Sequence, residues 1–184
     1  MKALKKILIT LAIIIAIPLI IAIFIKKDYA VHRNIVIERP LYEVFDFVRY
    51  LKNQDEYSRW SEMDPDMKKS YQGIDGTPGF ISAWDSKNQD VGKGEQEIIN
   101  IVENERINYL IRFYEPFEST DSAYMTTEFI AENQTLVSWG FKGHIGYPMN
   151  LMFLFMNFDN MLGSDLEYGL NKLKQIIETQ EVKK

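Results

Sequence analysis

The sequence of 184 residues contains no cysteine and only two histidines. The absence of cysteine excludes a disulfide scaffold, a thiolate metal site and a cysteine nucleophile, and it leaves the redox compartment open. His32 and His144 stand far apart, and neither lies in a motif that pairs a histidine with a nucleophile. No G-x-S-x-G, H-E-x-x-H, P-loop or dinucleotide-binding motif occurs. We therefore predict no catalytic set, no bound metal and no cofactor.

Basic residues are scarce outside the N-terminus. The first 27 residues hold five of the 21 lysines and arginines and none of the 26 acidic residues, so residues 28–184 carry a net charge of −10. An acidic domain of this size is a poor electrostatic partner for a phosphate backbone, which argues against nucleic-acid binding.

One long apolar run is present, at residues 7–25, and only Thr10 and Pro18 interrupt it. A helix of this length spans the hydrocarbon core of a bilayer, about 30 Å, once. A cleaved signal peptide is the alternative, but the run is longer than a usual signal core and no small-x-small cleavage site follows it. We predict a membrane anchor over residues 1–27 and one domain over residues 28–184.

The orientation of the anchor rests on small differences in charge. Lys2, Lys5 and Lys6 precede the apolar run, and Lys26 and Lys27 follow it, so the positive charges nearly balance. A very short charged tail has no reason to cross the membrane. We expect a single-pass protein of the cell membrane with its domain on the non-cytoplasmic side.

The domain begins with a short alternating strand over residues 32–38, and Pro40 then suits the first position of a helix. Apolar residues at spacings of three and four give that helix one buried face. Short β-rich runs separated by brief polar links follow, which favours consecutive antiparallel hairpins. These runs are residues 68–72, 80–85, 94–102, 107–113, 123–131 and 136–145.

After Pro148 the pattern predicts helix to the end of the chain. Leu162, Leu166, Leu170 and Leu173 recur every three or four residues, as on a helix that packs against a sheet. The order of elements predicts an α+β domain in which a curved antiparallel sheet wraps around one long C-terminal helix.

That order resembles the START-like, or SRPBCC, superfamily with its Bet v 1-like helix-grip fold, and more narrowly its polyketide cyclase/dehydrase-like branch. The resemblance covers residues 29–178, nearly the whole domain. It rests on six segments in order: residues 35–45, Trp60 with Asp64-Pro65, Thr77-Pro78-Gly79 with Trp84, residues 91–94 with Ile98 and Val102, Glu105-Arg106-Ile107, and residues 160–166 with Gly169, Leu170 and Leu173-Lys174. The resemblance implies a cavity between the sheet and the C-terminal helix, and leaves its use open.

We expect large apolar side chains and a few polar groups to line this cavity, although core packing is the alternative for each residue. Tyr109 and Thr127 are the polar candidates, followed by Gln96 and Asp165. The candidate ligand-binding residues are Trp84, Tyr109, Phe113, Thr127, Phe129, Trp139, Phe141, Met152, Met156 and Leu162.

Residues 147–162 are apolar around most of a helix circumference, so one face would need a second partner. This segment either rests against the bilayer and gates the cavity, or is wholly buried. Acidic residues at Glu103, Glu105, Glu115, Glu118 and Asp121 are expected in loops, where repulsion from anionic headgroups would keep that end away from a membrane.

Three functions are consistent with these patterns. The first is a membrane-anchored domain that binds a hydrophobic small molecule or lipid. The second is an enzyme of cyclase or dehydratase type, for which the pair Asp165 and Tyr109 is the first to inspect, and which a perturbed carboxyl beside a tyrosine or histidine in the cavity would favour. The third is a protein-interaction module with a filled core and an exposed apolar patch.

Overall fold

The computed structural model describes residues 2–179. Its elements follow the order that the sequence pattern predicts, and the segment between the second helix and the second strand forms short helices. They are α1 (Lys2–Phe24), β1 (Asp28–Ile37), α2 (Leu41–Val48), η1 (Leu51–Asn53), α3 (Gln54–Tyr57), α4 (Arg59–Met63), β2 (Lys68–Gln72), β3 (Ile81–Asp85), β4 (Lys93–Val102), β5 (Arg106–Glu115), β6 (Ser119–Ala131), β7 (Gln134–His144), η2 (Met149–Leu154) and α5 (Phe158–Thr179).

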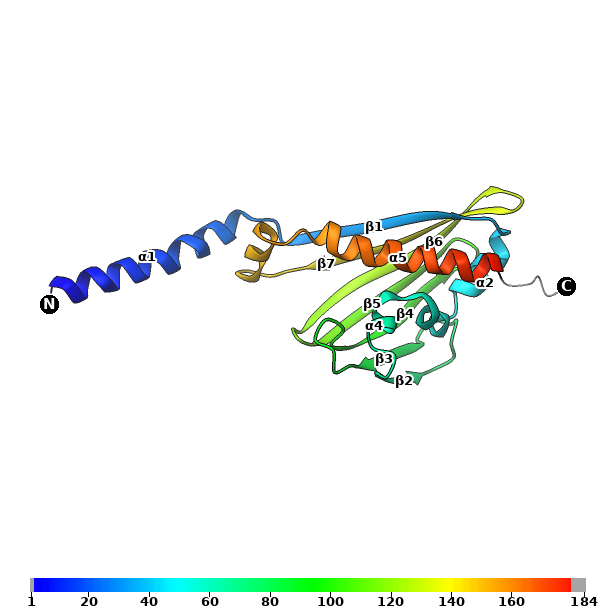
Figure 1. Ribbon diagram of the computed structural model, residues 1–184, viewed down its shortest axis with the longest axis horizontal. Helices are drawn as coiled ribbons and strands as arrows, with labels where there is room; N and C mark the ends of the chain where they lie inside the picture. Colours follow the sequence, from blue (N-terminus) through cyan, green and yellow to red (C-terminus); the bar gives the residue numbers. More distant parts are fainter. Residues whose placement is uncertain (1, 180–184) are drawn as a thin grey trace.

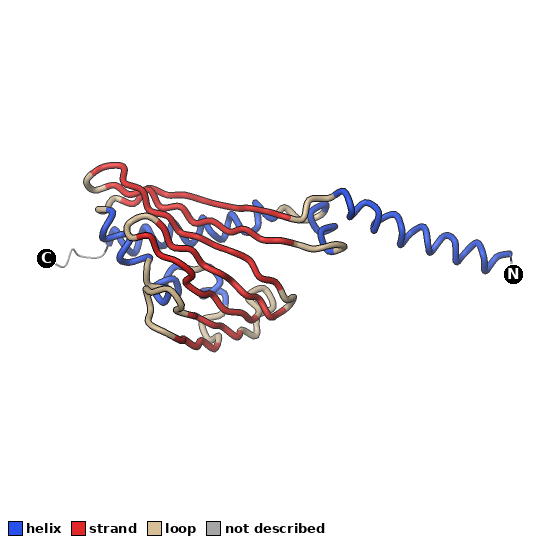
Figure 2. Tube along the Cα trace, turned by 180° about the vertical axis from the view of Figure 1, so that it is seen from behind, coloured by secondary structure: helices blue, strands red, loops and turns tan. Residues whose placement is uncertain are grey.

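The seven strands form one antiparallel sheet in the order β1-β7-β6-β5-β4-β3-β2. Strands β2 to β7 are consecutive hairpin neighbours, and β1 closes the far edge by pairing with β7. The sheet curves, and α5 runs along its concave face with α2 and the short helices (Figure 1). The same layers are visible from behind, where the strands cover the helices (Figure 2). The predicted α+β architecture is confirmed.

The concave face is packed solid at the end remote from α1. Helix α2 buries Val44, Phe45 and Val48 there, each at most 1% exposed. The C-terminal half of α5 adds Leu170 and Leu173, which are equally buried. This apolar cluster is the main core, and it extends across the inward residues of all the long strands.

Helix α1 projects away from the domain and is long and apolar enough to cross a membrane, a test that a signal sequence also passes (Figure 1). Its C-terminal end contacts η2. The side-chain amide of Asn150, which is fully buried, donates to the carbonyls of Ala22 at 2.7 Å and Ile25 at 3.0 Å. The last carbonyls of a helix lack intrahelical partners, and Asn150 supplies two of them with a donor.

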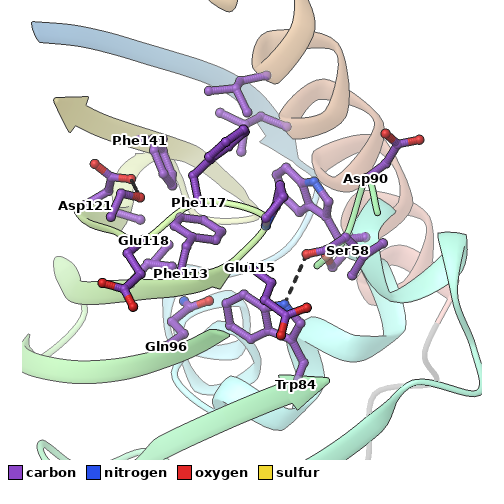
Figure 3. A pocket seen from close by; sticks show the side chains of 18 of the residues that line it. Ser58, Trp84, Asp90, Gln96, Phe113, Glu115, Phe117, Glu118, Asp121 and Phe141 are labelled. Atoms are coloured by element: carbon purple, nitrogen blue, oxygen red, sulfur yellow. Dashed lines mark hydrogen bonds between the residues drawn. The ribbon is translucent and has the colours of Figure 1, made fainter. Parts of the chain in front are cut away.

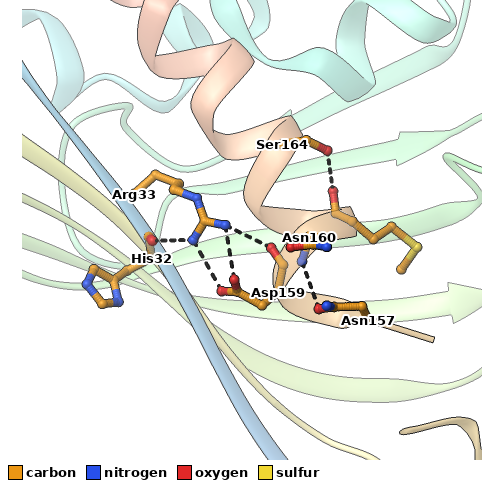
Figure 4. Close-up of polar contacts among 7 residues, drawn as sticks. His32, Arg33, Asn157, Asp159, Asn160 and Ser164 are labelled. Carbon is orange, nitrogen blue, oxygen red and sulfur yellow. Dashed lines mark hydrogen bonds and ion pairs between the residues drawn. The ribbon is translucent and has the colours of Figure 1, made fainter. Parts of the chain in front are cut away.

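The prediction of continuous helix after Pro148 was wrong. Residues 149–154 form a short 3-10 helix, residues 155–157 are not helical, and α5 begins at Phe158. Asn157 causes the restart, because its side-chain oxygen accepts a hydrogen bond from the backbone N–H of Asn160 at 3.1 Å, as an N-cap residue does (Figure 4). The first strand also begins earlier than predicted, at Asp28, immediately after the apolar helix.

An ion pair fixes the start of α5 to the edge strand. The guanidinium of Arg33 on β1 contacts both carboxylate oxygens of Asp159 at 3.2 Å and its carbonyl at 3.0 Å (Figure 4). This contact sets the position of α5 along the sheet at the end that faces α1.

The expectation of one acidic end was wrong, because the acidic residues lie at opposite ends of the sheet. Glu103 and Glu105 belong to the β4–β5 turn at the end remote from α1. Glu115 ends β5 and Glu118 lies in the β5–β6 connection, which the strand register places at the same end as Asp28. Asp121 is part of β6 and is 7% exposed.

Candidate functional site

A cavity of about 560 Å³ lies between the concave face of the sheet and the helices, at the end nearer α1. Its walls come from all seven strands, from the short helices between α2 and β2, from η2 and from the first turns of α5. Most of the wall is apolar, as in a typical small-molecule pocket. Figure 3 shows Trp84, Phe113 and Phe141 among the lining side chains.

The cavity exists because helix α2 fills only the remote half of the concave face. On β5, Ile111 and Phe113 line the cavity, whereas Tyr109, on the same face but further from α1, does not. On β6 the boundary falls between Ala123, which lines the cavity, and Met125, which is core. The boundary between the filled half and the cavity therefore runs across the strands. Residues on the concave face belong to the core on one side of it and to the cavity wall on the other.

Six of the ten predicted ligand-binding residues line this cavity: Trp84, Phe113, Trp139, Phe141, Met152 and Leu162. Tyr109 and Thr127 point inward but are only 3% and 4% exposed and lie in the filled half. The hydroxyl oxygen of Thr127 is buried without a hydrogen-bond partner among the described residues.

The inward placement of Phe129 was wrong. Phe129 is 64% exposed, because β6 and β7 extend beyond the helices as a projecting hairpin (Figure 1). A change of register between Phe129 and Ala131 accompanies this extension. Met156 is also outside the main cavity and lines a smaller groove of about 350 Å³ between η2 and β1.

The cavity wall contains a buried carboxyl, that of Asp121, at a position where the sequence pattern predicts a loop. The carboxylate of Asp121 lines the cavity and accepts hydrogen bonds from the Ser119 hydroxyl at 3.0 Å and the His144 backbone N–H at 3.2 Å. Burial raises the pKa of Asp121, which these two bonds partly oppose. Burial also raises the pKa of Tyr29, and the charge of Asp121 adds to that rise. The signal missed in the sequence was the period-two alternation of Asp121 with Ala123 and Met125.

Asp121 belongs to a row of residues that crosses the sheet. Ser82 pairs with Gln96, Gln96 with Ile111, and Ile111 with Asp121, so all four side chains share the cavity side. The amide nitrogen of Gln96 is buried and has no partner among residues 2–179. The row therefore offers polar groups to a ligand in an otherwise apolar wall, as predicted for Gln96.

Basic groups at the cavity already have acidic partners. Lys69 pairs with Asp55 at 2.8 Å, and the His144 imidazole contacts Asp28 at 2.6 Å. Asp165, the carboxyl first suggested for catalysis, does not line the cavity in the described structure, and the acidic residue that acts on Tyr109 is Asp75. Within residues 2–179, no group of three or more acidic or histidine residues could hold a metal ion.

The mouth of the cavity faces the end of the domain that carries α1. The exposed lining residues all lie in or next to three connections: Asp90 before β4, residues 115–118 from the end of β5 to the start of β6, and residues 144–149 from the end of β7 to the start of η2. Phe117 is 69% exposed there. Strand register brings these connections to one edge of the sheet, next to the start of β1.

No family model matches the chain, and no curated protein matches it. Several solved structures, however, resemble this chain. The truncated norcoclaurine synthase from Thalictrum flavum is similar with a TM-score of 0.63 and 8% identity, over 84% of this chain and 96% of that one. Ara h 8.0201 is similar with a TM-score of 0.56 and 12% identity, over 83% of this chain and 99% of that one.

The domain has a Bet v 1-like, helix-grip fold. A conserved protein of unknown function from Enterococcus faecalis shares it, with a TM-score of 0.53 and 12% identity over 84% of this chain and 74% of that one. At these identities the likeness establishes the fold alone. A fold of this kind does not fix a function, which depends on the residues of the cavity.

Proposed function

We propose that this protein is a membrane-anchored binding domain that takes up a hydrophobic small molecule or lipid in the cavity between the sheet and α5. The observation that carries the proposal is the cavity of about 560 Å³, whose aromatic and aliphatic walls lie beside a solid core. A protein-docking module would not need this space. Burial of apolar ligand surface in such a cavity supplies the binding energy, about 25 cal/mol for each Å² removed from water.

The placement of the mouth supports uptake from the bilayer. Helix α1 serves as the anchor, and Asn150 attaches its C-terminal end to the domain through the carbonyls of Ala22 and Ile25. The exposed apolar side chains of Phe24 and Phe155, 84% and 85% exposed, lie at this junction. The mouth opens at the same end of the sheet, where Phe117 and Tyr147 are exposed beside Glu115 and Glu118, so a ligand can pass between bilayer and cavity there.

Native mass spectrometry of the full chain, reconstituted in lipid nanodiscs and compared with a denatured sample, tests the proposal. We expect an additional mass that is lost on denaturation. Ser82→Trp places an indole in the cavity and should abolish the adduct. Ser70→Trp is the matched control, because Ser70 lies on the adjacent strand, is exposed and does not line the cavity. An adduct that survives Ser82→Trp would contradict the proposal.

Acid–base catalysis on the bound molecule is a second candidate, favoured by Asp121. A buried carboxyl with a raised pKa, in contact with the His144 backbone and close to Tyr29, is the arrangement expected of a general acid. Asp121→Asn removes the proton and keeps the size of the side chain. If the protein is an enzyme, this variant should retain the ligand and lose its turnover, which mass spectrometry of the bound molecule over time measures.

A further inference from the structure

The charge around the cavity is strongly unbalanced. Asp90, Glu115 and Glu118 are exposed at the mouth, and Asp121 is buried just inside it (Figure 3). The basic side chains of the wall are Lys69 and His144, and each is held by an acidic partner. A molecule that enters therefore passes a negative field, and each basic side chain among the described lining residues is already paired with a carboxylate.

The buried carboxyl is the decisive element of this arrangement. Asp121 is 7% exposed, and its hydrogen bonds come from a hydroxyl and a backbone N–H, both of them neutral donors. Among residues 2–179 no salt bridge reaches it. Buried carboxylates are costly unless paired, and a cation supplied by the ligand would complete this one.

Aromatic rings surround the same space. Phe113 contacts Trp84 and Phe141 with centroid separations of 5.9 and 6.4 Å, and all three line the cavity whose wall also contains Asp121. The faces of aromatic rings attract cations, and ammonium groups in particular bind in aromatic surroundings. An anionic head would meet the carboxylates and the negative ring faces together.

We infer that the cavity selects cationic amphiphiles, with an amine or quaternary ammonium head on an apolar body, over anionic ones. The inference rests on the proposed binding function and names its ligand class. The apolar body occupies the aromatic interior, and the head lies near Asp121 at the acidic mouth. Fatty acids and other anionic lipids are excluded by the same charges.

Photo-crosslinking of the full chain in phosphatidylcholine nanodiscs tests this directly. Three probes share one long alkyl chain that carries a diazirine, and differ only in a quaternary ammonium, a hydroxyl or a carboxylate head. Peptide mapping gives labelling of the cavity wall, at residues 111–123 and 139–152, relative to labelling of α1. Because α1 reports the amount of probe in the bilayer, the ratio corrects for unequal partitioning.

We expect the ammonium probe to exceed the carboxylate probe at the cavity wall by about tenfold, as one close charge contact near a protein surface allows. The exposed pair Glu115→Gln with Glu118→Gln, and separately Asp121→Asn, should each bring this ratio towards one. Glu128→Gln is the control, since Glu128 lies on the same strand as Asp121 but is exposed and outside the cavity.

The possible outcomes distinguish the charge selection from the binding function on which it rests. Cavity labelling by all three probes at equal ratios would overturn the charge selection and leave the binding function intact. Absence of cavity labelling with every probe would overturn the binding function itself. Unchanged selectivity in both acidic variants and in Asp90→Asn, with folding verified by circular dichroism, would also overturn the inference, because Asp90, Glu115, Glu118 and Asp121 carry the negative charge of the mouth.

Discussion

Asn150 donates a hydrogen bond of 2.7 Å to the carbonyl of Ala22, across 128 residues of sequence. Both residues are fully buried, so the end of α1 is held by a side chain of the domain rather than by water. The contact makes the apolar helix and the domain one continuous unit at their junction. It also determines which end of the cavity faces the membrane that α1 is proposed to span.

Replacement of Asn150 by Ala should loosen this junction. The carbonyls of Ala22 and Ile25 would lose their donor, at a cost of about 1–3 kcal/mol for a buried group left unpaired. Hydrogen exchange of the full chain in nanodiscs should show residues 145–156 exchanging about tenfold faster. Asn171→Ala is the control, because that amide bonds within α5 alone. Equal exchange in both variants would show that packing holds the junction without the amide.

Phe155 is expected to reside in the membrane interface. It is 85% exposed and follows η2, which contacts the end of α1. The chain contains no cysteine, so Phe155→Cys can be spin-labelled at a single site without other changes. In nanodiscs the label should be more accessible to oxygen than to a water-soluble nickel complex.

The matched position for this measurement is Ile74, which is 75% exposed in the β2–β3 connection. A label at Ile74→Cys should show the reverse order of accessibility, because that connection lies at the end of the sheet remote from α1. A water-exposed label at position 155 would disprove membrane contact of this segment. Phe153 is unsuitable for the test, because its ring packs against Tyr29 and Phe158.

Gly169 allows α5 to lie close to the sheet, and Ala at this position should destabilise the domain. An added Cβ would stand 2.7 Å from the Trp139 ring and 3.2 Å from the Tyr57 carbonyl oxygen. Glycine to alanine in an open helix gains about 1 kcal/mol, whereas overpacking costs about 1–3 kcal/mol. We expect the net effect to be a lower free energy of unfolding, measured by chemical denaturation of the full chain in micelles.

Gly146→Ala provides the comparison, because no atom lies within 4 Å of a Cβ at that position. Its effect should stay within about 0.5 kcal/mol, as for most surface substitutions. A stabilising Gly169→Ala would show that α5 can move away from the Trp139 ring. Because that ring lines the cavity, such a shift would also alter ligand binding.

The Arg33–Asp159 ion pair should make the stability of the folded domain depend on pH in the acidic range. The Arg33 guanidinium lowers the pKa of Asp159 below its value in the unfolded chain, about 3.9. The ion pair therefore contributes its full stabilisation above about pH 4. That stabilisation is lost as the pH falls through the lowered pKa of Asp159 in the folded protein. Asp159→Asn should lower the thermal midpoint at pH 7, and the difference from the original protein should shrink in stronger acid.

Asp46→Asn is the control for this titration, since Asp46 is an exposed residue of α2. The Asp46→Asn substitution should leave the thermal midpoint unchanged at pH 7 and in stronger acid. A midpoint difference for Asp159→Asn that is equal at pH 7 and in strong acid would assign the effect to helix capping or packing and not to the ion pair. Both series use circular dichroism of the full chain.

The strands and their order could be predicted because each carries its own signal. Period-two alternation and the short polar links between strands are local, so β2 was placed with the bounds that the structure has, and β3 to β7 within a few residues. The stripe of leucines on α5 likewise predicted its packing face. The apolar run after Pro148 predicted one continuous helix. The helix is instead interrupted and starts again at Phe158, where the side chain of Asn157 caps it.

The cavity wall could be predicted only in part, because alternation tells which face a residue occupies and not how far along the sheet it lies. Tyr109 and Phe113 share a strand and a face, yet the first is buried in the core and the second lines the cavity. Phe129 continues the alternation of β6 into a hairpin that no helix covers.

By itself, the sequence determined the apolar N-terminal helix, the α+β class and the consecutive hairpins, because hydropathy and turn chemistry act between near neighbours. Only the tertiary structure decided where the cavity lies, that Asp121 is buried in its wall, and that its mouth opens beside α1. Those features depend on strand register and on the length of α2 against the curved sheet. They are relations between residues far apart in the chain, which no local pattern records.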